Sequence, residues 1–519
     1  MRSIHVRIIM VCAVLAAVGS GVWHLLPADR GKDRPISVGT TDEVTSLDPA
    51  GAYDSGSWAV YSNVYQSLLT FKPGATTPVP DAAETCDFVG SSLTRYECTL
   101  REGLTFSNGR EMTARDVKHS FDRMLGIAAD VGPSTLFPTL ESVTTQGRKV
   151  VFSLTAEDAT FPLKLATGAG SIVDSTRYPE DRLREGTAVD GSGPYVLAEY
   201  RPGVRALLEP NPNYRGALER PATPVEVRYF AEGEQLAAAW RDGEVDVTHR
   251  DLPPRTISTL DPGEEGVRVT EAPTAETRSI VFNLREGSAT AEKAVRRAVA
   301  ALVDRSRIAS GPYRSTVEPL YSLIPRGFIG HSTPFFDLYP DGREGVDRAR
   351  KLLRDADVDT PVSLTYAHRA GETSAAEAVE LRRQLEDTGL FRVKVVSAEW
   401  KEFQKGYADG AYDAYGIGWL PDFPDSDSFT QPLVGRGGTL QNAYASARVD
   451  RLIADTQQHV DRARAADGFK EIQARVAEDV PLVPLWQKKD YVLSNPDITG
   501  AQYLSDGTGI WRLWELSWL

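Results

Sequence analysis

Hydrophobic residues recur with two different spacings along the chain, and each spacing predicts a type of element. Apolar positions three to four residues apart predict helices with one buried face over 57–71 and over 114–125. The second helix starts at Thr113, three residues before Asp116, which is the pattern of a capping box. Short strands are predicted at 35–40 and within 96–109, and a hairpin with a turn at Arg201-Pro202-Gly203 is predicted over 191–214.

From about Thr274 onward, predicted strands alternate with predicted helices. Strands are expected at 277–284, 361–369, 391–400 and 480–494, and helices at 291–308, 345–358, 374–389 and 447–460. The order strand, helix, strand implies parallel strands joined by a crossover helix, so this part of the chain is predicted to be α/β. The tryptophans near the C-terminus have helical spacing, and we expect them to pack in a core or to dock the tail.

The first 26 residues have a different character from the rest. Arg2 and Arg7 precede an apolar run from Ile8 to Trp23, which is the pattern of an export signal. As a helix this run is about 24 Å long, short for a bilayer core of about 30 Å, and residues 24–26 make it marginally long enough. Cleavage near Gly19 and retention of 8–26 as a membrane anchor both fit the pattern. In either case the body of the protein is expected outside the cytoplasm, because the arginines hold the N-terminus inside.

Composition and charge narrow the choice of partners. The chain has 519 residues, enough for two to four domains, and its formal net charge is −14. An acidic excess of this size argues against a nucleic-acid partner, because the charge repels the phosphate backbone. It favours neutral or cationic ligands.

Two of the three cysteines are candidates for a disulfide. Cys12 lies in the apolar run, whereas Cys86 and Cys98 flank two strand-like arms around Gly90-Ser91-Ser92. A hairpin there would bring them together, and an oxidising compartment would favour their disulfide. The alternative is a pair of free, buried thiols. No metal site is predicted, because no further Cys or His occurs at ligand spacing.

The sequence contains none of the common catalytic or nucleotide-binding motifs. It has no nucleophile elbow, zincin motif, Walker A loop or dinucleotide fingerprint, and its seven histidines lie far apart. A glycosidase carboxylate pair is defined only in space, so the sequence leaves that possibility open. We therefore predict a binding protein with no cofactor, not an enzyme.

One acidic stretch is a candidate for ligand binding. The segment GWLPDFPDSDSF, residues 418–429, sets Asp422, Asp425 and Asp427 among aromatic rings and is stiffened by two prolines. Proline and serine are typical of a loop. The segment is either a solvated acidic turn or a site for a ligand's positive charge.

Five segments together resemble the family 5 extracellular solute-binding proteins, the peptide and nickel receptors of ABC importers. They are 46–71, 96–125, 191–214, 282–308 and 412–429. The most specific is LREGLTFSNG followed by TARDV and SF. The matches extend from about residue 36 to residue 494.

The resemblance implies a two-lobed, type II clamshell of α/β class with an extra inserted subdomain. Ligand would bind between the lobes and be buried by closure about a hinge. Expected divisions are the signal or anchor with its linker (1–34), a discontinuous lobe I (35–59, 189–271 and 489–519), the inserted subdomain (60–188) and lobe II (272–488).

The resemblance also implies ligand-binding residues. In peptide-binding members an Asp in a W-x-x-D-[YF] loop pairs with the ligand's α-ammonium, and Trp419 and Asp422 match that motif, with Phe423 in place of Tyr. The bound peptide would lie extended and hydrogen-bond through its backbone. By the same resemblance Ser46, Leu47, Gly193 and Asn283 would line the cleft, although turn and strand-end roles also fit Gly193 and Asn283.

The resemblance implies partners and leaves alternatives open. The expected partners are a peptide ligand and an ABC permease with its cytoplasmic ATPases, and the receptor is expected to act as a monomer. No lipobox precedes a cysteine, so a membrane-spanning or cleaved N-terminus is preferred to a lipid anchor. The alternatives are a receptor of the same fold for an oligosaccharide, an opine or a metal chelate, and a membrane-anchored signalling protein uncoupled from transport.

Overall fold

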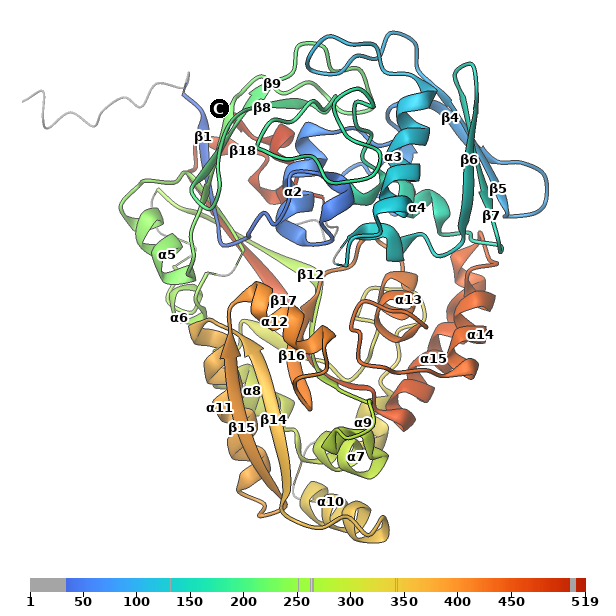
Figure 1. Cartoon of the computed structure of the whole chain (residues 1–519). Helices are drawn as coiled ribbons and strands as arrows, with labels where there is room; N and C mark the ends of the chain where they lie inside the picture. Colours follow the sequence, from blue (N-terminus) through green and yellow to red (C-terminus); the bar gives the residue numbers. More distant parts are fainter. Residues whose placement is uncertain are drawn as a thin grey trace, which may run out of the picture.

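The structure, a computed structural model, consists of two lobes. It describes residues 34–130, 132–250, 252–261, 263, 266–340, 342, 344–504 and 510–519. One cluster of buried hydrophobic side chains lies between residues 36 and 247 and in 492–516, with Phe423 added, and we call the lobe around it lobe I. A second cluster, between residues 275 and 486, fills lobe II. Figure 1 shows lobe I above lobe II, so the predicted two-lobed α/β fold is confirmed.

One sheet runs through both lobes. Its strands follow the order β15, β14, β16, β12, β17, β11, β1, β10, β9, β8, and β13 pairs with β17. The predicted first strand and the predicted hairpin, β8 and β9, are both present. The strands are β1 (Ile36–Thr40), β8 (Tyr195–Arg201), β9 (Arg205–Pro210), β10 (Val225–Tyr229), β11 (Val247–His249), β12 (Arg268–Phe282), β13 (Val317–Pro319), β14 (Val362–Arg369), β15 (Phe391–Ala398), β16 (Ala414–Trp419) and β17 (Leu482–Ser494).

Strands β12 and β17 connect the two lobes. They pair antiparallel from Arg268 opposite Ser494 to Val281 opposite Leu482, with two register shifts between. The expected divisions at 271/272 and 488/489 fall within these strands. A pair of crossing strands is a connection about which two lobes can hinge.

Residues 83–170 add a second layer to lobe I. Their four-stranded antiparallel sheet has the order β4, β5, β7, β6, and its buried side chains belong to the lobe I cluster. Helix α3 starts at the predicted capping box of Thr113 and Asp116. Cys86 lies opposite Cys98 on β4 and β5, and a disulfide joins them. The elements are β4 (Ala83–Phe88), β5 (Arg95–Leu100), α3 (Ala114–Ile127), η2 (Pro133–Leu136), β6 (Leu140–Gln146), β7 (Lys149–Leu154), α4 (Phe161–Leu165) and η3 (Gly168–Gly170).

The first long helix is shorter than its sequence pattern indicated. A helix was expected over 57–71, but α2 spans Ser55–Val64, and Leu69–Thr70 form the strand β2, paired with β3 (Val79–Pro80). The carbonyl of Val64 accepts a hydrogen bond from the Gly193 N–H at 3.0 Å. This long-range contact takes the acceptor that one more helical turn would use, so the prediction beyond Val64 was wrong.

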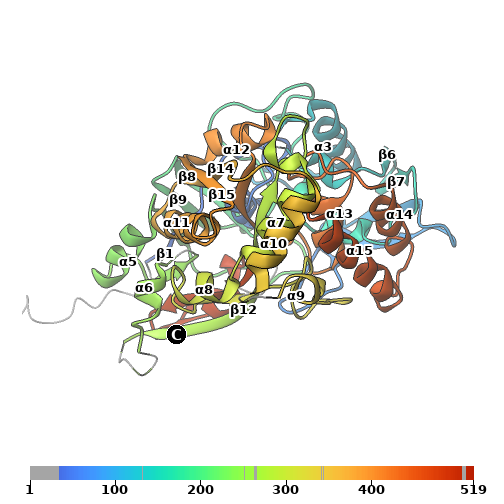
Figure 2. The ribbon, with the colours of Figure 1, turned by 90° about the horizontal axis from the view of Figure 1, so that it is seen from below.

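Lobe II contains the predicted parallel unit. β14 and β15 pair in parallel and are joined by α11 (Glu372–Glu386). The view from below in Figure 2 shows α7 and α10 side by side. The other helices of this lobe are η4 (Ala289–Ala291), α7 (Lys293–Leu302), α8 (Arg305–Ser310), α9 (Pro334–Leu338), α10 (Glu344–Asp355), α12 (Trp400–Ala408), α13 (Asp427–Val434), α14 (Ala447–Thr456), η5 (Arg462–Ala465) and α15 (Ala466–Asp479).

The C-terminal tail returns to lobe I. Trp511 and Trp514 are buried there, so the predicted docking of the tail is confirmed, although they lie in irregular and 3-10 structure, not in an α-helix. The remaining elements of this lobe are η1 (Pro49–Gly51), α5 (Gly233–Arg241), α6 (Pro254–Ile257), β18 (Ile498–Thr499), η6 (Ala501–Leu504), η7 (Leu513–Glu515) and β19 (Ser517–Trp518).

Candidate ligand-binding site

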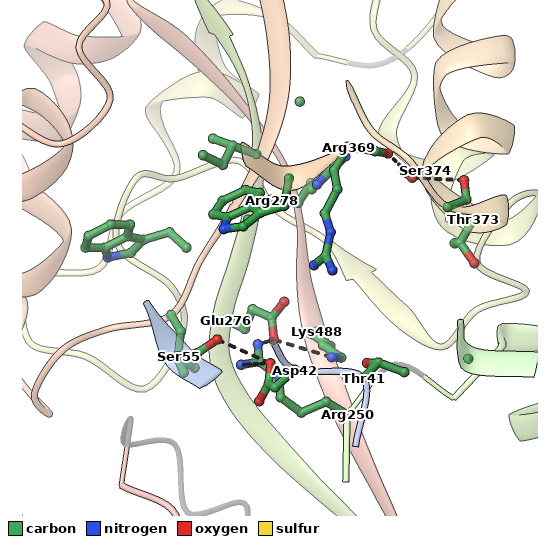
Figure 3. Close-up of a pocket in the computed structure, with 18 of the residues that line it drawn as sticks. Thr41, Asp42, Ser55, Arg250, Glu276, Arg278, Arg369, Thr373, Ser374 and Lys488 are labelled. Atoms are coloured by element: carbon green, nitrogen blue, oxygen red, sulfur yellow. Dashed lines mark hydrogen bonds and ion pairs between the residues drawn. The ribbon is translucent and has the colours of Figure 1, made fainter. Parts of the chain in front are cut away.

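A cavity of about 440 Å³ lies between the lobes. Lobe I contributes the segments around Asp42 and Tyr53 and the start of α6. Lobe II contributes the ends of β14 and β16 and the side of α12 that faces lobe I. Figure 3 shows side chains from both lobes around this space. A volume of this size is typical of sites for small ligands.

Asp422 lies in this cavity on the loop between β16 and α13. Its side chain is almost fully buried, and the Tyr53 hydroxyl of lobe I donates a hydrogen bond to Oδ2 at 2.7 Å. The Asp422 N–H donates to Ser428 Oγ, also at 2.7 Å, which fixes the loop against the first turn of α13. The carboxylate is therefore held in place from both lobes.

Burial raises the pKa of Asp422 to about 7, while hydrogen bonds from Tyr53 and Ser428 act to lower it. Burial and the charge of Asp422 raise the pKa of Tyr53 well above its usual value, so Tyr53 stays a donor. Among the described residues, no Arg, Lys or His forms an ion pair with Asp422. A cation brought to this carboxylate would favour its ionised form.

The two aromatic residues of the loop have different positions. Trp419 lines the cavity, donates from Nε1 to the Ser428 carbonyl at 2.8 Å and meets the Tyr53 ring edge-on. Phe423 points the other way and is fully buried in the lobe I cluster. The loop thus presents Asp422 and Trp419 to the cavity and uses Phe423 to attach itself to the opposite lobe.

The structure keeps the other expected site residues away from this cavity. Ser46 Oγ accepts a hydrogen bond from the Asp48 N–H, and the Leu47 carbonyl accepts one from the Tyr65 hydroxyl. Neither residue is part of the described cavity wall, so their contact with a ligand stays a prediction.

Gly193 and Asn283 also lie outside the cavity wall that the described residues form. A Cβ at Gly193 would lie 2.5 Å from the Asn63 carbonyl oxygen, so close backbone packing explains the glycine. Asn283 donates from Nδ2 to the Gly410 carbonyl and accepts from the Arg285 N–H. Both have structural roles here, and a ligand contact by either one stays a prediction.

Arg369, at the end of β14, is a cavity residue that the sequence reasoning missed. Its guanidinium carbon lies 5.7 Å from the centroid of the Trp400 ring, and Figure 3 shows the side chain extending into the cavity. Within the described part of the chain, its guanidinium makes no hydrogen bond or ion pair. The sequence did contain an indication of this role. Arg369 is the last residue of a predicted parallel strand, and ligands of α/β sheets bind beyond the carboxyl ends of such strands.

The other cations of the cavity already have carboxylate partners. Arg250 and Lys488 both contact Glu276, at 2.9 and 3.4 Å, where β12 and β17 cross between the lobes. Arg278 Nε donates to the buried Glu377 at 2.9 Å. Among the cavity cations described, Arg369 is the one without a carboxylate, and it can therefore accept an anionic group of a ligand.

The described residues show no cluster suited to a metal ion and no membrane-spanning helix. No three of their His, Cys, Asp and Glu side chains are grouped to hold a metal. None of their helices has both the length and the apolar character needed to cross a bilayer. The predicted signal or anchor, residues 8–26, lies outside the described residues.

Comparison with known proteins identifies the family. The profile of the bacterial extracellular solute-binding proteins, family 5 Middle, matches residues 77–441. The chain therefore belongs to family 5 of the bacterial extracellular solute-binding proteins, which confirms the resemblance. It is a member of a class of extracytoplasmic solute receptors.

Individual relatives cover nearly the whole chain. The probable D,D-dipeptide-binding periplasmic protein DdpA of Escherichia coli is 25% identical, with 96% of each chain covered. Di/tripeptide-binding protein 2 of Pseudomonas aeruginosa is 26% identical, with 88% of this chain and 90% of that protein covered. The structure of the periplasmic binding protein DppA from Helicobacter pylori, in complex with the peptide STSA, matches with a TM-score of 0.84 and 19% identity over 94% of this chain and 99% of that one.

Proposed function

We propose that this protein is the receptor of an ABC importer and binds short peptides that have both ends free. Asp422 pairs with the α-ammonium group of the peptide, and Arg369 pairs with its terminal carboxylate. The observation that carries the proposal is that these two opposite charges line one interlobe cavity and lack ion-pair partners among the described residues.

The electrostatics favour a zwitterionic ligand. Charge-assisted hydrogen bonds are about twice as strong as neutral ones, and a buried charge without a partner costs roughly 2–5 kcal/mol. A free peptide supplies one partner to each group. Trp419 and Trp400 add apolar walls on which peptide side chains can pack.

The relatives support the same ligand class. Those reported above are named for dipeptides and tripeptides or were solved with a peptide. Family membership supports the partners expected for such a receptor, a membrane permease with cytoplasmic ATPases. Closure of the lobes about β12 and β17 would bury the peptide and present the closed form to the permease.

Isothermal titration calorimetry tests the proposal with four forms of one dipeptide: Ala-Ala, N-acetyl-Ala-Ala, Ala-Ala-amide and the doubly blocked compound. We expect Ala-Ala to bind and each blocking group to weaken binding at least tenfold. In the Arg369→Gln variant, Ala-Ala-amide should bind nearly as well as Ala-Ala, because the partner of the carboxylate is gone. N-acetylation should still weaken binding as much as it does in the wild-type protein. Equal binding of the acetylated and free forms, or binding of only oligosaccharides or nickel chelates, would contradict the proposal.

A further inference from the structure

A second interlobe cavity opens beside the first and is not used by the two ends of the ligand. It has a volume of about 450 Å³. Tyr53, Gln404, Tyr407, Thr439 and Leu440 line both cavities, so these residues surround the passage between them. The second cavity therefore continues the binding site and is not a separate surface pocket.

The passage lies at the Asp422 end of the site. Tyr53, which forms the lobe I side of the passage, is the residue whose hydroxyl contacts Asp422 Oδ2 at 2.7 Å. Asp422 and Arg369 both line the first cavity and are absent from the described wall of the second, but Tyr53 lines both cavities, whereas Trp400, which contacts Arg369, lines only the first. A peptide held between Asp422 and Arg369 would thus direct its first side chain, not its last, towards the second cavity.

The wall of the second cavity combines apolar surface with polar groups that are mostly uncharged. Amide and hydroxyl side chains come from α12, from the segment 435–444 and from η2 of lobe I: Gln404, Gln441, Asn442, Thr135, Thr439 and Tyr444. Three of them already have partners in the protein, since Thr439 and Asn442 donate to backbone carbonyls and Tyr444 donates to Asp479, which leaves Gln404, Gln441 and Thr135 to meet a ligand. The cation present, Arg285, already donates to Asn283 Oδ1 and to the Ala408 carbonyl. Asp130 lies exposed at the edge.

We infer that this second cavity is a specificity pocket for a bulky, uncharged, polar side chain at the amino-terminal position of the peptide. The inference rests on the proposed function and adds a preference to it. An amide or hydroxyl group of the ligand could pair with Gln404, Gln441 and Thr135, whereas an apolar chain would displace water from these groups without replacing its hydrogen bonds. A cationic chain would meet Arg285.

Dissociation constants of Gln-Ala, Leu-Ala, Lys-Ala and Gly-Ala, measured by calorimetry on the wild-type protein, test the preference. We expect Gln-Ala to bind at least tenfold more tightly than the other three. Equal affinities for Gln-Ala and Gly-Ala would overturn the inference and leave the peptide receptor standing. Tighter binding of Leu-Ala or Lys-Ala than of Gln-Ala would contradict the inferred preference for a polar, uncharged side chain. If no dipeptide binds, the proposed function is contradicted as well.

A blocking variant tests the location. Thr135 is exposed and lines the second cavity but not the first, so Thr135→Trp should fill the pocket with little effect on folding. This variant should bind Gln-Ala at least tenfold more weakly than wild type, and its affinity for Gly-Ala should change less than twofold. Thr135→Ser should leave both affinities unchanged. Equal losses for Gln-Ala and Gly-Ala, or no loss for either at an unchanged melting temperature, would place the first side chain elsewhere and overturn the inference.

Discussion

At the scale of single residues, the proposed function rests chiefly on Asp422, whose buried charge also weakens the ligand-free protein. Burial raises its pKa to about 7, so the folded protein binds a proton there that the unfolded chain, with a pKa near 4, has lost. The free energy of unfolding therefore falls as pH rises from about 4 through about 7. In the proposed complex, pairing of the ligand's ammonium group with the carboxylate would restore this lost stability.

Asp422→Asn should separate these two effects. In the ligand-free protein at pH 8 we expect the variant to be more stable than wild type by about 1–3 kcal/mol, with the difference vanishing near pH 4. The same variant should lose at least 30-fold in affinity for Ala-Ala, because the ammonium no longer meets a charge. Urea unfolding of ligand-free protein at pH 4 and pH 8 measures the difference in stability, and calorimetry measures the loss of affinity. A variant that is less stable at pH 8 would show that the charge is compensated within the protein.

Peptide affinity should depend on pH in a bell-shaped manner. Below about pH 7 the carboxyl of free Asp422 is protonated, so affinity falls and binding releases a proton. Above about pH 8 the peptide α-ammonium, with a pKa of 7.7–8.0, loses its charge and affinity falls again. Calorimetry from pH 5 to 9 in buffers of different ionisation enthalpy checks both limbs. In Asp422→Asn the acidic limb should disappear, and its persistence would assign it to another group.

The two charged ends of the site differ in how far the sequence could predict them. Asp422 stands in a proline-rich loop with Trp419, and the resemblance of that loop to the W-x-x-D-[YF] motif of peptide-binding family members selected it. Arg369 has no such motif. It is one of many arginines in the chain, and it lies at the end of a strand. Only the pairing of Arg250, Lys488 and Arg278 with Glu276 and Glu377 in space distinguishes it from other cavity cations.

At the scale of elements, the loop between β16 and α13 joins the lobes through Phe423. Its ring packs in the lobe I cluster while its backbone continues a lobe II strand. Phe423→Ala should cost about 3–5 kcal/mol of stability when measured with the lobes closed, since truncation of a buried Phe leaves a cavity. Peptide affinity should fall as well, because Asp422 is the preceding residue and loses its fixed position.

Thermal unfolding with and without Ala-Ala measures the effect of Phe423→Ala. Phe423→Leu, which keeps most of the apolar volume, is the matched control and should cost less than about 2 kcal/mol. A large loss of affinity with no loss of stability would instead place the Phe423 ring on the ligand.

The sequence predicted helices and strands well where the local pattern of residues determines their bounds. It predicted them less well where contacts with distant residues determine the bounds. The α3 capping box, the β8–β9 hairpin and the parallel β14–α11–β15 unit all follow from local periodicity. Helix α2 ends early because Gly193, far along the chain, donates to the Val64 carbonyl. No window of sequence around α2 contains that information.

At the scale of the whole molecule, the lobes touch at a second place, where α4 of lobe I meets α14 of lobe II. The Ala159 N–H donates to the Gln457 carbonyl at 2.7 Å, and Gln457 Nε2 donates to both carboxylate oxygens of Asp427. Burial raises the pKa of Asp427 to about 6, against the attraction of Lys164. The resemblance predicted two lobes and closure, but it did not predict which side chains hold the closed form.

Gln457→Ala should therefore affect release of the ligand more than its capture. The variant keeps the Gln457 carbonyl that accepts from Ala159, but it removes the two side-chain hydrogen bonds to Asp427. The Asp427 carboxylate also accepts from Thr160 Oγ1 of lobe I at 3.4 Å, so the variant weakens the lobe II side of this interlobe contact, at a cost of about 1–2 kcal/mol. We expect peptide dissociation to quicken about 5–30-fold in stopped-flow tryptophan fluorescence while the association rate changes less than twofold. Gln458→Ala, at the exposed neighbouring position, should behave as wild type. If Gln457→Ala slows association and leaves dissociation unchanged, this contact forms before the ligand is enclosed and does not hold the closed state.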